Sequence, residues 1–356
     1  MNKTALYNAH KNLNAKIVSF ADYLMPINYD NGIQFEYNAV RNNVGMFDVS
    51  HMGQIFIKGK DSLKLIEFIT INNVNKLKIG DAQYSAICNN EGGIKDDVIV
   101  YRNKNDYLLI VNASNSDKIY NWIKFNNKFD CKAENRSQDY SLIAVQGPLS
   151  RKILEKLFEQ KIDLKFYKHS VLKYKKNNVF ISRTGYTGEL GYEILTDNKI
   201  IIDLWRKLID LKVIPCGLAV RDVLRIEMRY CLYGNEISEK ITPVEANLNW
   251  ILSFDKNFVG KDILLQQKKK GIKKILVGFK MSDKCIPRHG YRIFSENSEI
   301  GFVTSGTYSI GLSNGIGLGF IKSNYNEKNI YLEVRGKKLK GEIVKGPFLL
   351  GTSLHD

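Results

Sequence analysis

Two adjacent aspartates, Asp96 and Asp97, are the first feature of this sequence that could carry chemistry. They open a β-rich run, DDVIVY, shortly after a Gly-Gly turn. Successive side chains of a strand point to opposite faces, so we expect only one of the two to point into the protein. Asp97 shares its face with Ile99 and Tyr101, and burial among such neighbours raises the pKa of a carboxyl group. Asp97 is therefore a candidate acid or base; the alternative is a pair of ordinary turn acids.

A glycine-rich stretch, SRTGYTGELGYE at 182–193, is the second such feature. Its three glycines, one arginine, two tyrosines and two glutamates predict a rigid polar loop that leads into a strand. The carboxylate of Glu193 ends this stretch and could accept two parallel N–H donors. The alternative is a hairpin that carries a surface glutamate.

Two arginines, Arg221 and Arg225, stand one helical turn apart on the same side of the stretch PCGLAVRDVLRIE at 215–227. Arginine presents a planar fork of donors that recognises a carboxylate with two hydrogen bonds. Asp222, near the expected helix start, suits the helix dipole. The alternative is that the arginines form internal ion pairs with Glu227 or another acid.

A fourth stretch, VGMFDVSHMG at 44–53, combines methionine and aromatic residues with a lone histidine. Such side chains offer apolar surface to a ring, although core packing is the alternative. We interpret His51 as a hydrogen-bonded structural residue rather than a base or a ligand. Together the four stretches supply a carboxylate, a bidentate acceptor, an arginine and aromatic walls. That set suits a flat heteroaromatic ligand with donor edges and a carboxylate tail.

Several common reaction motifs are absent from the sequence. It has no Walker loop, no GxGxxG that opens a helix, no HExxH and no GxSxG. Without a Walker loop or a GxGxxG motif, we expect no nucleotide cofactor. The five histidines are scattered, so we expect no metal site. The five cysteines stand far apart and form no CxxC, which argues against a disulfide framework. We find no signal peptide and no apolar run of about 18 residues, and we therefore expect a cytoplasmic protein.

Short β-rich runs alternate with amphipathic helices through most of the chain. The predicted strands are 54–59, 84–88, 97–102 and 107–113. The predicted helices cover about 116–126, a segment that begins after Gly147-Pro148, about 198–210 and about 219–231. We expect Ser116 to cap the first helix and Pro148 to lie in the first turn of the second.

From about residue 274 the pattern changes to short β runs separated by Gly, Asn and Ser, which is typical of a small barrel or sandwich. The basic run KKKGIKK at 268–274 precedes it. We interpret this run as a lysine-rich helix end followed by a glycine stop; a polyanion-binding patch is the alternative. The formal net charge of +16 favours anionic partners, although lysines also fill ordinary surface positions.

Beyond these patterns, the sequence resembles the T protein of the glycine cleavage system, the tetrahydrofolate-dependent aminomethyltransferase family. The resemblance runs nearly end to end, and its separated blocks occur in the family's order. The blocks are MP at 25–26, VGMFDVSHMG at 44–53, YSAICNNEGGIKDDVIVY at 84–101, LLIVNASN at 108–115, IAVQGP at 143–148, SRTGYTGELGYE at 182–193, LYGNEI at 232–237, TPVEANLNW at 242–250, DKNFVGK at 255–261, VTSGTYS at 303–309 and PF at 347–348.

The resemblance implies an α+β fold of three parts arranged as a cloverleaf. Residues 1–272 would form a folate-binding region of two interleaved α+β subdomains, and residues 273–356 a small C-terminal β-barrel. Tetrahydrofolate, as a co-substrate, would lie in the central hole. The implied reaction moves an aminomethyl group from the lipoyl arm of H protein to tetrahydrofolate, which gives 5,10-methylenetetrahydrofolate, ammonia and dihydrolipoyl H protein.

Residue by residue, Asp97 resembles the family's essential aspartate near the reacting folate nitrogens. Glu193 resembles the acid that holds the pterin edge, and Arg221 the folate-contacting arginine. Other matched positions surround the pterin and the linker ring: Met52, Tyr84, Tyr101, Tyr186 and Tyr230. Asn112 matches a polar position near the site. The implied partners are lipoylated H protein and tetrahydrofolate, with or without a polyglutamate tail, and neither nucleic acid nor a membrane.

The chain also departs from the family pattern. Asp22-Tyr23-Leu24 stands where the family usually has Gly-Trp, Glu36-Tyr37 replaces Glu-His, and GLAVRD replaces GLGARD. The tail GTSLHD lacks the basic or aromatic residues that commonly contact the folate tail, so no residue is assigned to that end of the ligand.

Three alternatives remain at this point. The first is a related tetrahydrofolate-dependent demethylase. The second is a folate-binding factor for iron–sulphur assembly, although the stretch NFVGKDIL lacks the cysteine of the KGCYxGQE-type block that marks that family. The third, of a different class, is a non-catalytic basic nucleic-acid-binding protein.

Overall fold

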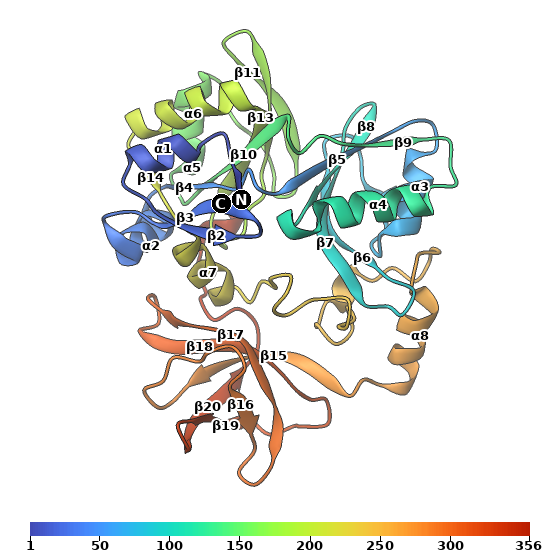
Figure 1. Ribbon diagram of the computed structural model, residues 1–356, viewed down its shortest axis with the longest axis vertical. Coiled ribbons are helices and arrows are strands. Elements are labelled where there is room, and N and C mark those ends of the chain that lie inside the picture. The colour runs from blue at the N-terminus through green and yellow to red at the C-terminus, as the bar shows by residue number, and fades with distance from the viewer.

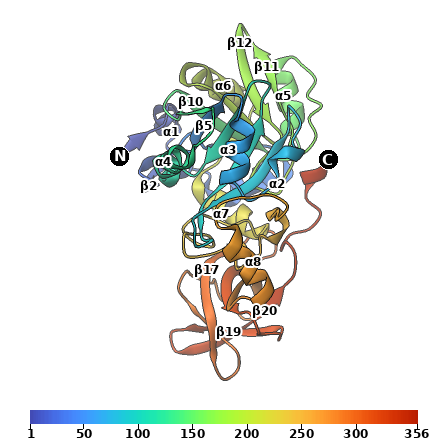
Figure 2. The ribbon, with the colours of Figure 1, turned by 90° about the vertical axis from the view of Figure 1, so that its right-hand side faces the viewer.

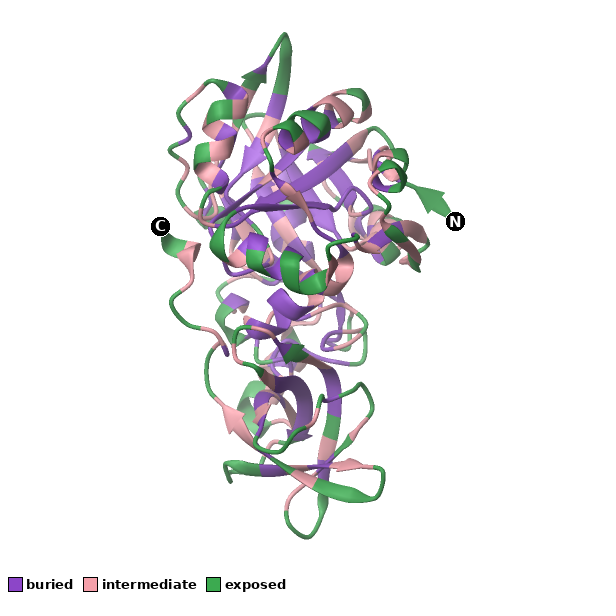
Figure 3. Ribbon diagram, turned by 90° about the vertical axis from the view of Figure 1, so that its left-hand side faces the viewer, coloured by how far each residue is buried: buried purple, intermediate pink, exposed green.

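The computed structural model describes residues 1–356 and has three lobes (Figure 1). Two lobes are each built on an open sheet, and the third is a closed barrel formed by the C-terminal part of the chain. Buried residues concentrate in the sheets, whereas the exposed ones lie along loops, helix faces and the outer barrel (Figure 3).

The first lobe contains a six-stranded sheet with two helices that share its core. Across the sheet the strands are β11 (His169–Tyr174), β12 (Asn177–Ser182), β13 (Gly191–Asp197), β10 (Tyr140–Gln146), β4 (Gly45–Asp48) and β14 (Ile214–Pro215). The helices α5 (Ser150–Phe158) and α6 (Asn198–Asp210) contribute to one hydrophobic cluster with β10 and β13. The helix α6 buries Ile201, Leu204, Trp205 and Leu208, which is the apolar stripe of the predicted helix.

The second lobe contains a five-stranded sheet. Its strands are β6 (Ala82–Cys88), β7 (Ile94–Arg102), β8 (Asp106–Val111), β5 (Gly53–Lys58) and β9 (Lys132–Asn135). Helices α3 (Ser62–Ile69) and α4 (Ser116–Asn126) pack against one face of it. This lobe contains all four strands predicted from the sequence.

The two sheets are interleaved along the chain. The chain leaves β4 of the first sheet, builds the whole second sheet, and returns to the first sheet at β10, which pairs with β4. A small three-stranded sheet, β1 (Asn2–Lys3), β3 (Tyr23–Asn28) and β2 (Lys16–Phe20), lies beside the first lobe with α1 (Tyr7–Asn12), α2 (Gly32–Asn42) and α7 (Leu218–Glu227). The predicted α+β class with two interleaved subdomains is confirmed.

The C-terminal lobe is a closed six-stranded barrel, as predicted. Its strands are β15 (Lys274–Met281), β18 (Asn314–Lys322), β17 (Glu299–Ser309), β16 (Arg292–Phe294), β19 (Asn329–Val334) and β20 (Lys337–Val344). Figure 2 shows the barrel below the other lobes, with the two chain ends on opposite sides. The division of the chain at residue 272 stays a prediction.

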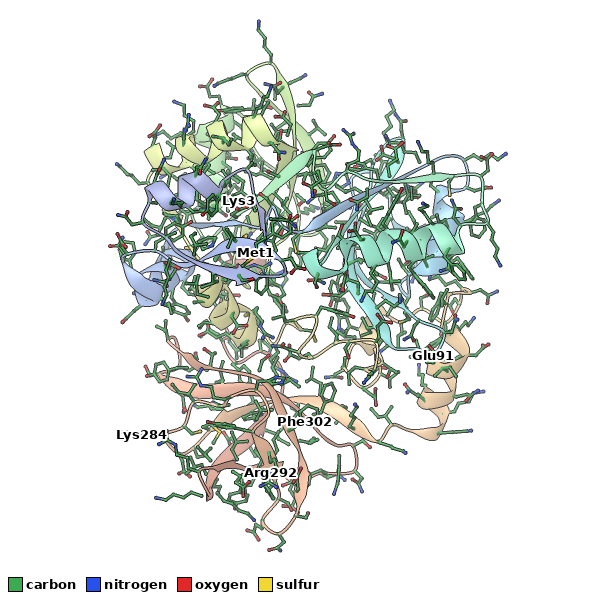
Figure 4. All side chains as sticks on the ribbon, in the orientation of Figure 1. Met1, Lys3, Glu91, Lys284, Arg292 and Phe302 are labelled. Atoms are coloured by element: carbon green, nitrogen blue, oxygen red, sulfur yellow. The ribbon has the colours of Figure 1, made fainter.

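The basic run before the barrel ends a helix, as interpreted from the sequence. Helix α8 (Lys261–Lys270) has three lysines in its last turn and is followed by Gly271, which has a φ of 84°. Cations suit a helix C-terminus, and a left-handed glycine stops the helix. Figure 4 places Glu91, in the turn before β7, beside this helix.

Three local predictions are wrong. Pro148 does not lie in the first turn of α5, because that helix begins at Ser150 and its N-cap is Leu149. The helix expected over about 219–231 ends at Glu227, because Arg229 adopts a φ of 60° and its N–H returns to the Ile226 carbonyl at 2.9 Å. Ser116 does not cap α4; it is the first helical residue, and the capping position belongs to Asn115. Because α7 ends at Glu227, Tyr230 and the residues after it lie outside the helix. None of the helices is both long and apolar enough to cross a lipid bilayer.

Candidate functional site

The two predicted acids lie on sheet faces that border the same core. On β7, Asp97 shares a face with Ile99 and Tyr101, and on β13, Glu193 shares a face with Leu195. Those apolar neighbours all pack in or against the hydrophobic cluster between the two sheets. Residues of α7 belong to the same cluster, so the two sheets and α7 meet there. We call the surroundings of Asp97, Glu193 and Arg221 the central site.

The paired aspartates follow a β-bulge. In the register of β6 and β7, Asp96 pairs with Ile87 but Ile94 pairs with Cys88, so Lys95 is an extra residue. Bulges re-aim the side chains that follow them and are common beside active sites. Asp96 is fully buried, and Asp97 is half-buried. The expectation that only one aspartate points into the protein is wrong, because both faces of β7 are covered.

Asp97 is held by neutral partners. The Tyr84 hydroxyl donates to Oδ2 of Asp97 at 3.0 Å, and Nδ2 of Asn112 donates to Oδ1 at 2.6 Å. Burial raises the pKa of Asp97, while these two donors and the nearby charge of Arg221 oppose the shift. The arrangement gives a well-oriented carboxyl group with no ion-pair partner.

Glu193 is positioned by the glycine-rich loop. The side chain of Gln146 fills the space beside Gly185 and Gly191, where any Cβ would overlap it. This packing shapes the loop so that Thr184 Oγ1 donates to Oε2 of Glu193 at 2.5 Å. The other oxygen, Oε1, has no hydrogen-bond partner in the protein and is not enclosed. Burial raises the pKa of Glu193, and Thr184 and Arg221 oppose the shift.

Arg221 lies in the central site without an ion pair. Its guanidinium lies over the ring of Tyr186, 4.6 Å from the centroid, and Tyr186 stacks on Tyr230 at 5.7 Å. The hydroxyl of Tyr186 donates to the carbonyl of Cys231, which fixes the ring. Burial lowers the pKa of Arg221. The ion-pair alternative holds for Arg225 instead, which binds Glu236 at 2.8 Å.

Met52 and Tyr101 line the wall between the sheets. Met52 is half-buried and packs against the cluster that contains Tyr101. The Tyr101 hydroxyl lies 3.2 Å from both Ser182 Oγ and Thr184 Oγ1. The predicted hydrogen bond of His51 is absent, since this buried side chain makes none. Burial and Arg221 lower the pKa of His51 to about 4, so it is neutral near pH 7.

The structure therefore brings the nine predicted residues together in three groups. Tyr84 and Asn112 hold Asp97, Tyr101 shares Thr184 with Glu193, and Arg221 stacks with Tyr186 and Tyr230 while Met52 packs beside Tyr101. Eight of them are half-buried and Tyr101 is buried. Partial exposure leaves these eight side chains accessible to solvent.

Sequence reasoning missed two aromatic residues near Asp97. Trp250 stacks on Tyr84 at 5.7 Å and is 69% exposed. Tyr167 has a φ of 59°, an uncommon backbone conformation for a bulky residue, and lies near enough to Asp97 and Glu193 for their charges to raise its pKa. Trp250 was within a block quoted for the resemblance, and Tyr167 stands in a segment without any pattern.

A separate cavity of about 610 Å³ lies beside the C-terminal tail. It is lined by residues of α2, by Glu189 and by the tail from Leu349 to Ser353. None of the nine predicted residues lines it. Nowhere do three or more His, Cys, Asp or Glu side chains gather in an arrangement that could hold a metal ion.

Comparison with known proteins identifies the family. Residues 6–256 match the GCVT N-terminal domain, and residues 274–349 match the glycine cleavage T-protein C-terminal barrel domain. The chain belongs to the glycine cleavage T-protein family. Proteins named aminomethyltransferase from Thermosipho melanesiensis and Halothermothrix orenii are 46% and 45% identical to it. The alignments cover 99% and 98% of this chain, and 98% and 100% of those relatives.

The T-protein fold is also seen in a solved relative. The crystal structure of glycine cleavage system aminomethyltransferase T from Bartonella henselae matches with a TM-score of 0.92 and 30% sequence identity. That match covers 98% of each chain. The chain is thus a transferase of the aminomethyltransferase family, as the resemblance implied.

Proposed function

We propose that this T-protein family member transfers the aminomethyl group carried by the lipoyl arm of H protein to tetrahydrofolate. The products are 5,10-methylenetetrahydrofolate, ammonia and the dihydrolipoyl carrier. The observation that carries the proposal is a pair of oriented carboxyl groups, Asp97 and Glu193, that both lie near the charge of Arg221 and have no ion-pair partner. Family membership supports the reaction class.

Glu193 would hold the ligand by its pterin edge. The free oxygen Oε1 can accept an N–H from the pterin while Thr184 keeps the carboxylate oriented through Oε2. A carboxylate accepts two parallel N–H donors from one edge of a planar ring. Because burial raises the pKa of this group, its charge is less well compensated by the protein, and a donor edge would supply the missing stabilisation.

Aromatic side chains and Arg221 would bind the rings of the same ligand. Tyr84, Tyr186, Tyr230 and Met52 are partly exposed and offer apolar surface near the two acids, whereas Tyr101 is buried. Arg221 already lies over one aromatic ring and has free donors for an anionic or carbonyl oxygen. Asn112 would serve indirectly, because it orients Asp97.

Asp97 would act on the transferred carbon. One folate nitrogen attacks the methylene carbon as the carbon–sulphur bond breaks and the lipoyl thiolate leaves. Loss of ammonia then gives a cationic iminium carbon, which the second folate nitrogen attacks as it loses its proton to the departing thiolate or amine. The Asp97 carboxylate would stabilise this cation and orient the attacking nitrogen. Fixing two reactants in attack geometry can supply roughly 7–11 kcal/mol of the barrier. A positioned acid or base adds roughly 10²–10⁴-fold in rate.

The exposed ring of Trp250 supports one route for the carrier's arm. It stacks on Tyr84, whose hydroxyl binds Asp97, so an aromatic pair connects the surface to the reacting acid. An apolar lipoyl arm could lie along that pair, and the net charge of +16 would speed association with an acidic carrier.

A product assay tests the proposed function. Purified protein is mixed with tetrahydrofolate and H protein that carries the aminomethylated lipoyl arm, and methylenetetrahydrofolate and ammonia are measured. Equal amounts of both are expected, with none when the carrier lacks its lipoyl group. A methylated amine donor in place of the carrier tests the demethylase alternative. Transfer from that donor but not from the carrier would refute the proposal.

A further inference from the structure

We propose that residues 352–356 of the C-terminal tail form a clasp that positions the glycine-rich loop for tetrahydrofolate, with Ser353 as its positioning residue. The loop consists of residues 183–190, between β12 and β13. The inference deepens the proposed function and rests on it, because that function assigns the pterin edge to Glu193, the third residue of β13. The clasp would act on the loop and touch neither substrate.

The tail runs from the barrel to the first lobe, as Figure 2 shows. It leaves the barrel after β20, and the N–H of Phe348 donates to the carbonyl of Glu227, the last residue of α7, at 2.7 Å. Residues 352–356 then reach the glycine-rich loop. One continuous segment therefore connects the barrel to the loop that precedes Glu193.

The clasp binds the end of the loop that leads into β13. The backbone N–H and Oγ of Ser353 donate to Oε2 of Glu189 at 2.9 and 2.5 Å, and Oγ accepts the N–H of Leu190 at 3.0 Å. Oε1 of Glu189 accepts from Arg41 at 2.7 Å. Glu189 is buried, and two of the three donors to its carboxylate belong to the clasp. Without them this carboxylate would be poorly compensated.

The clasp also binds the start of the loop. Nη2 of Arg183 donates to the backbone oxygens of Leu354 and Asp356 at 3.1 and 2.6 Å. The Arg183 side chain is buried, and it directly precedes Thr184, which donates to Glu193. Both ends of the loop are thus bound to the same short segment.

The loop needs such support because no helix or strand fixes its backbone. It contains Gly185 and Gly188, and Gly188 adopts a φ of 78°. Ordering glycine costs more conformational entropy than ordering other residues. Contacts that order the loop before the ligand arrives reduce the cost of binding. The clasp should therefore raise the affinity for tetrahydrofolate without contacting it.

Ser353→Ala tests the proposal, and Ser309→Ala is its matched control. Each serine hydroxyl donates to a buried glutamate, Ser353 to Glu189 at 2.5 Å and Ser309 to Glu227 at 2.6 Å. Each also accepts one leucine backbone N–H, at 3.0 and 3.1 Å. Ser309 lies on β17 and makes no hydrogen bond to the loop. Glu189→Gln would not break the clasp, because the amide keeps an oxygen for both Ser353 donors.

The first measurement is amide hydrogen exchange in the ligand-free, full-length protein. Residues 184–188 should exchange roughly 3–30-fold faster in Ser353→Ala than in the wild type, because the lost hydrogen bonds lower the free energy of local opening. Ser309→Ala should leave this rate close to that of the wild type, and Ser353→Thr, which keeps the hydroxyl, should restore it. Equal exchange in the wild type and Ser353→Ala would overturn the proposal.

The second measurement separates positioning from a purely structural role. In Ser353→Ala, the Kd and KM for tetrahydrofolate should rise roughly 3–10-fold, while kcat and the KM for the carrier stay near the wild-type values. A purely structural serine would instead lower the Tm and leave the folate KM unchanged, as we expect for Ser309→Ala. Equal changes in the folate KM of the two variants would overturn the proposal.

If Ser353→Ala does not fold, the wild type gives the test by linkage. Saturating tetrahydrofolate should slow amide exchange in residues 352–356, and unchanged exchange there would overturn the proposal. The ligand-free measurement needs neither folate nor carrier, so it separates this inference from the proposed function. A loop that depends on the clasp in a protein that transfers no aminomethyl group would refute the function alone. Full transfer activity with a loop that does not depend on the clasp would refute this inference alone.

Discussion

Glu227 and Glu236 are buried where the barrel meets the N-terminal lobes, a region we call the seam, and each is paired with an arginine. Arg41 Nη2 binds Glu227 at 2.5 Å, and Arg225 Nη1 binds Glu236 at 2.8 Å. In the central site, by contrast, Asp97 and Glu193 bind only amide and hydroxyl groups. Both regions bury carboxyl groups, but only the seam supplies their counter-charges from the protein.

The difference shows which acids hold the fold together and which are left available for a ligand. In the seam, Ser305 and Ser309 of β17 donate hydrogen bonds to Glu236 and Glu227. The two paired glutamates therefore connect the barrel to the rest of the chain. In the central site, Arg221 lies near Asp97 and Glu193 but forms a salt bridge with neither of them. Unpaired buried charge opposes folding unless a ligand completes it.

The largest effect is expected from Asp97→Asn. The change is nearly isosteric and removes the charge that would stabilise the cationic carbon, so turnover should fall roughly 10²–10⁴-fold. Steady-state kinetics with the aminomethylated carrier measures it. Because Asp97 has no ion-pair partner, the free energy of unfolding should be unchanged or slightly raised. A near-normal rate would remove Asp97 from the mechanism.

The seam should respond in the opposite way. Glu236→Gln leaves Arg225 buried beside a neutral side chain, and the free energy of unfolding should fall by about 3–5 kcal/mol. Denaturant unfolding measures this loss. The matched control is Glu299→Gln, which breaks an exposed pair with Arg292, a barrel residue labelled in Figure 4, and should cost about 1 kcal/mol or less. Equal losses would show that the seam pair contributes no more than a surface pair.

Glu193→Gln sharpens the comparison for binding. The variant keeps the shape of the side chain but presents an amide to the donor edge of the ligand, which should cost about 1.5–3 kcal/mol, or roughly 10–100-fold in affinity for tetrahydrofolate. Isothermal titration calorimetry measures the affinity, and Glu189→Gln, in the same loop but bound to Arg41, is the control. Stability should fall in the control and not in Glu193→Gln; the reverse pattern would exchange the roles of the two glutamates.

The smallest effect is expected at the rim of the site. Trp250→Ala removes an exposed aromatic contact worth about 0.5–1.5 kcal/mol, so the KM for the carrier should rise roughly 2–10-fold. The KM for tetrahydrofolate should change less, and Trp250→Phe should restore most of the loss. Equal changes in both KM values would show that Trp250 supports the folate side instead.

Much of this arrangement follows from the sequence. Alternating apolar residues predict the strands that carry Asp97 and Glu193, and the resemblance identifies both acids. The full burial of Asp96 does not follow, because strand parity places this residue on an outer face and reveals neither the bulge at Lys95 nor the amides of Asn112 and Asn115. The sequence also does not show which arginine forms an ion pair. Arg221 and Arg225 look equivalent in it, and only long-range packing places Glu236 beside Arg225. The position of Tyr167 depends on a left-handed backbone conformation at that residue, which no local sequence pattern indicates.

A crystal structure of the protein with tetrahydrofolate bound tests the central claim most directly. We expect a pterin nitrogen within roughly 2.7–3.2 Å of Oε1 of Glu193, and the reacting nitrogens on the Asp97 side of the site. Ligand density in the cavity beside the C-terminal tail, with the Glu193 carboxylate still free, would contradict the account.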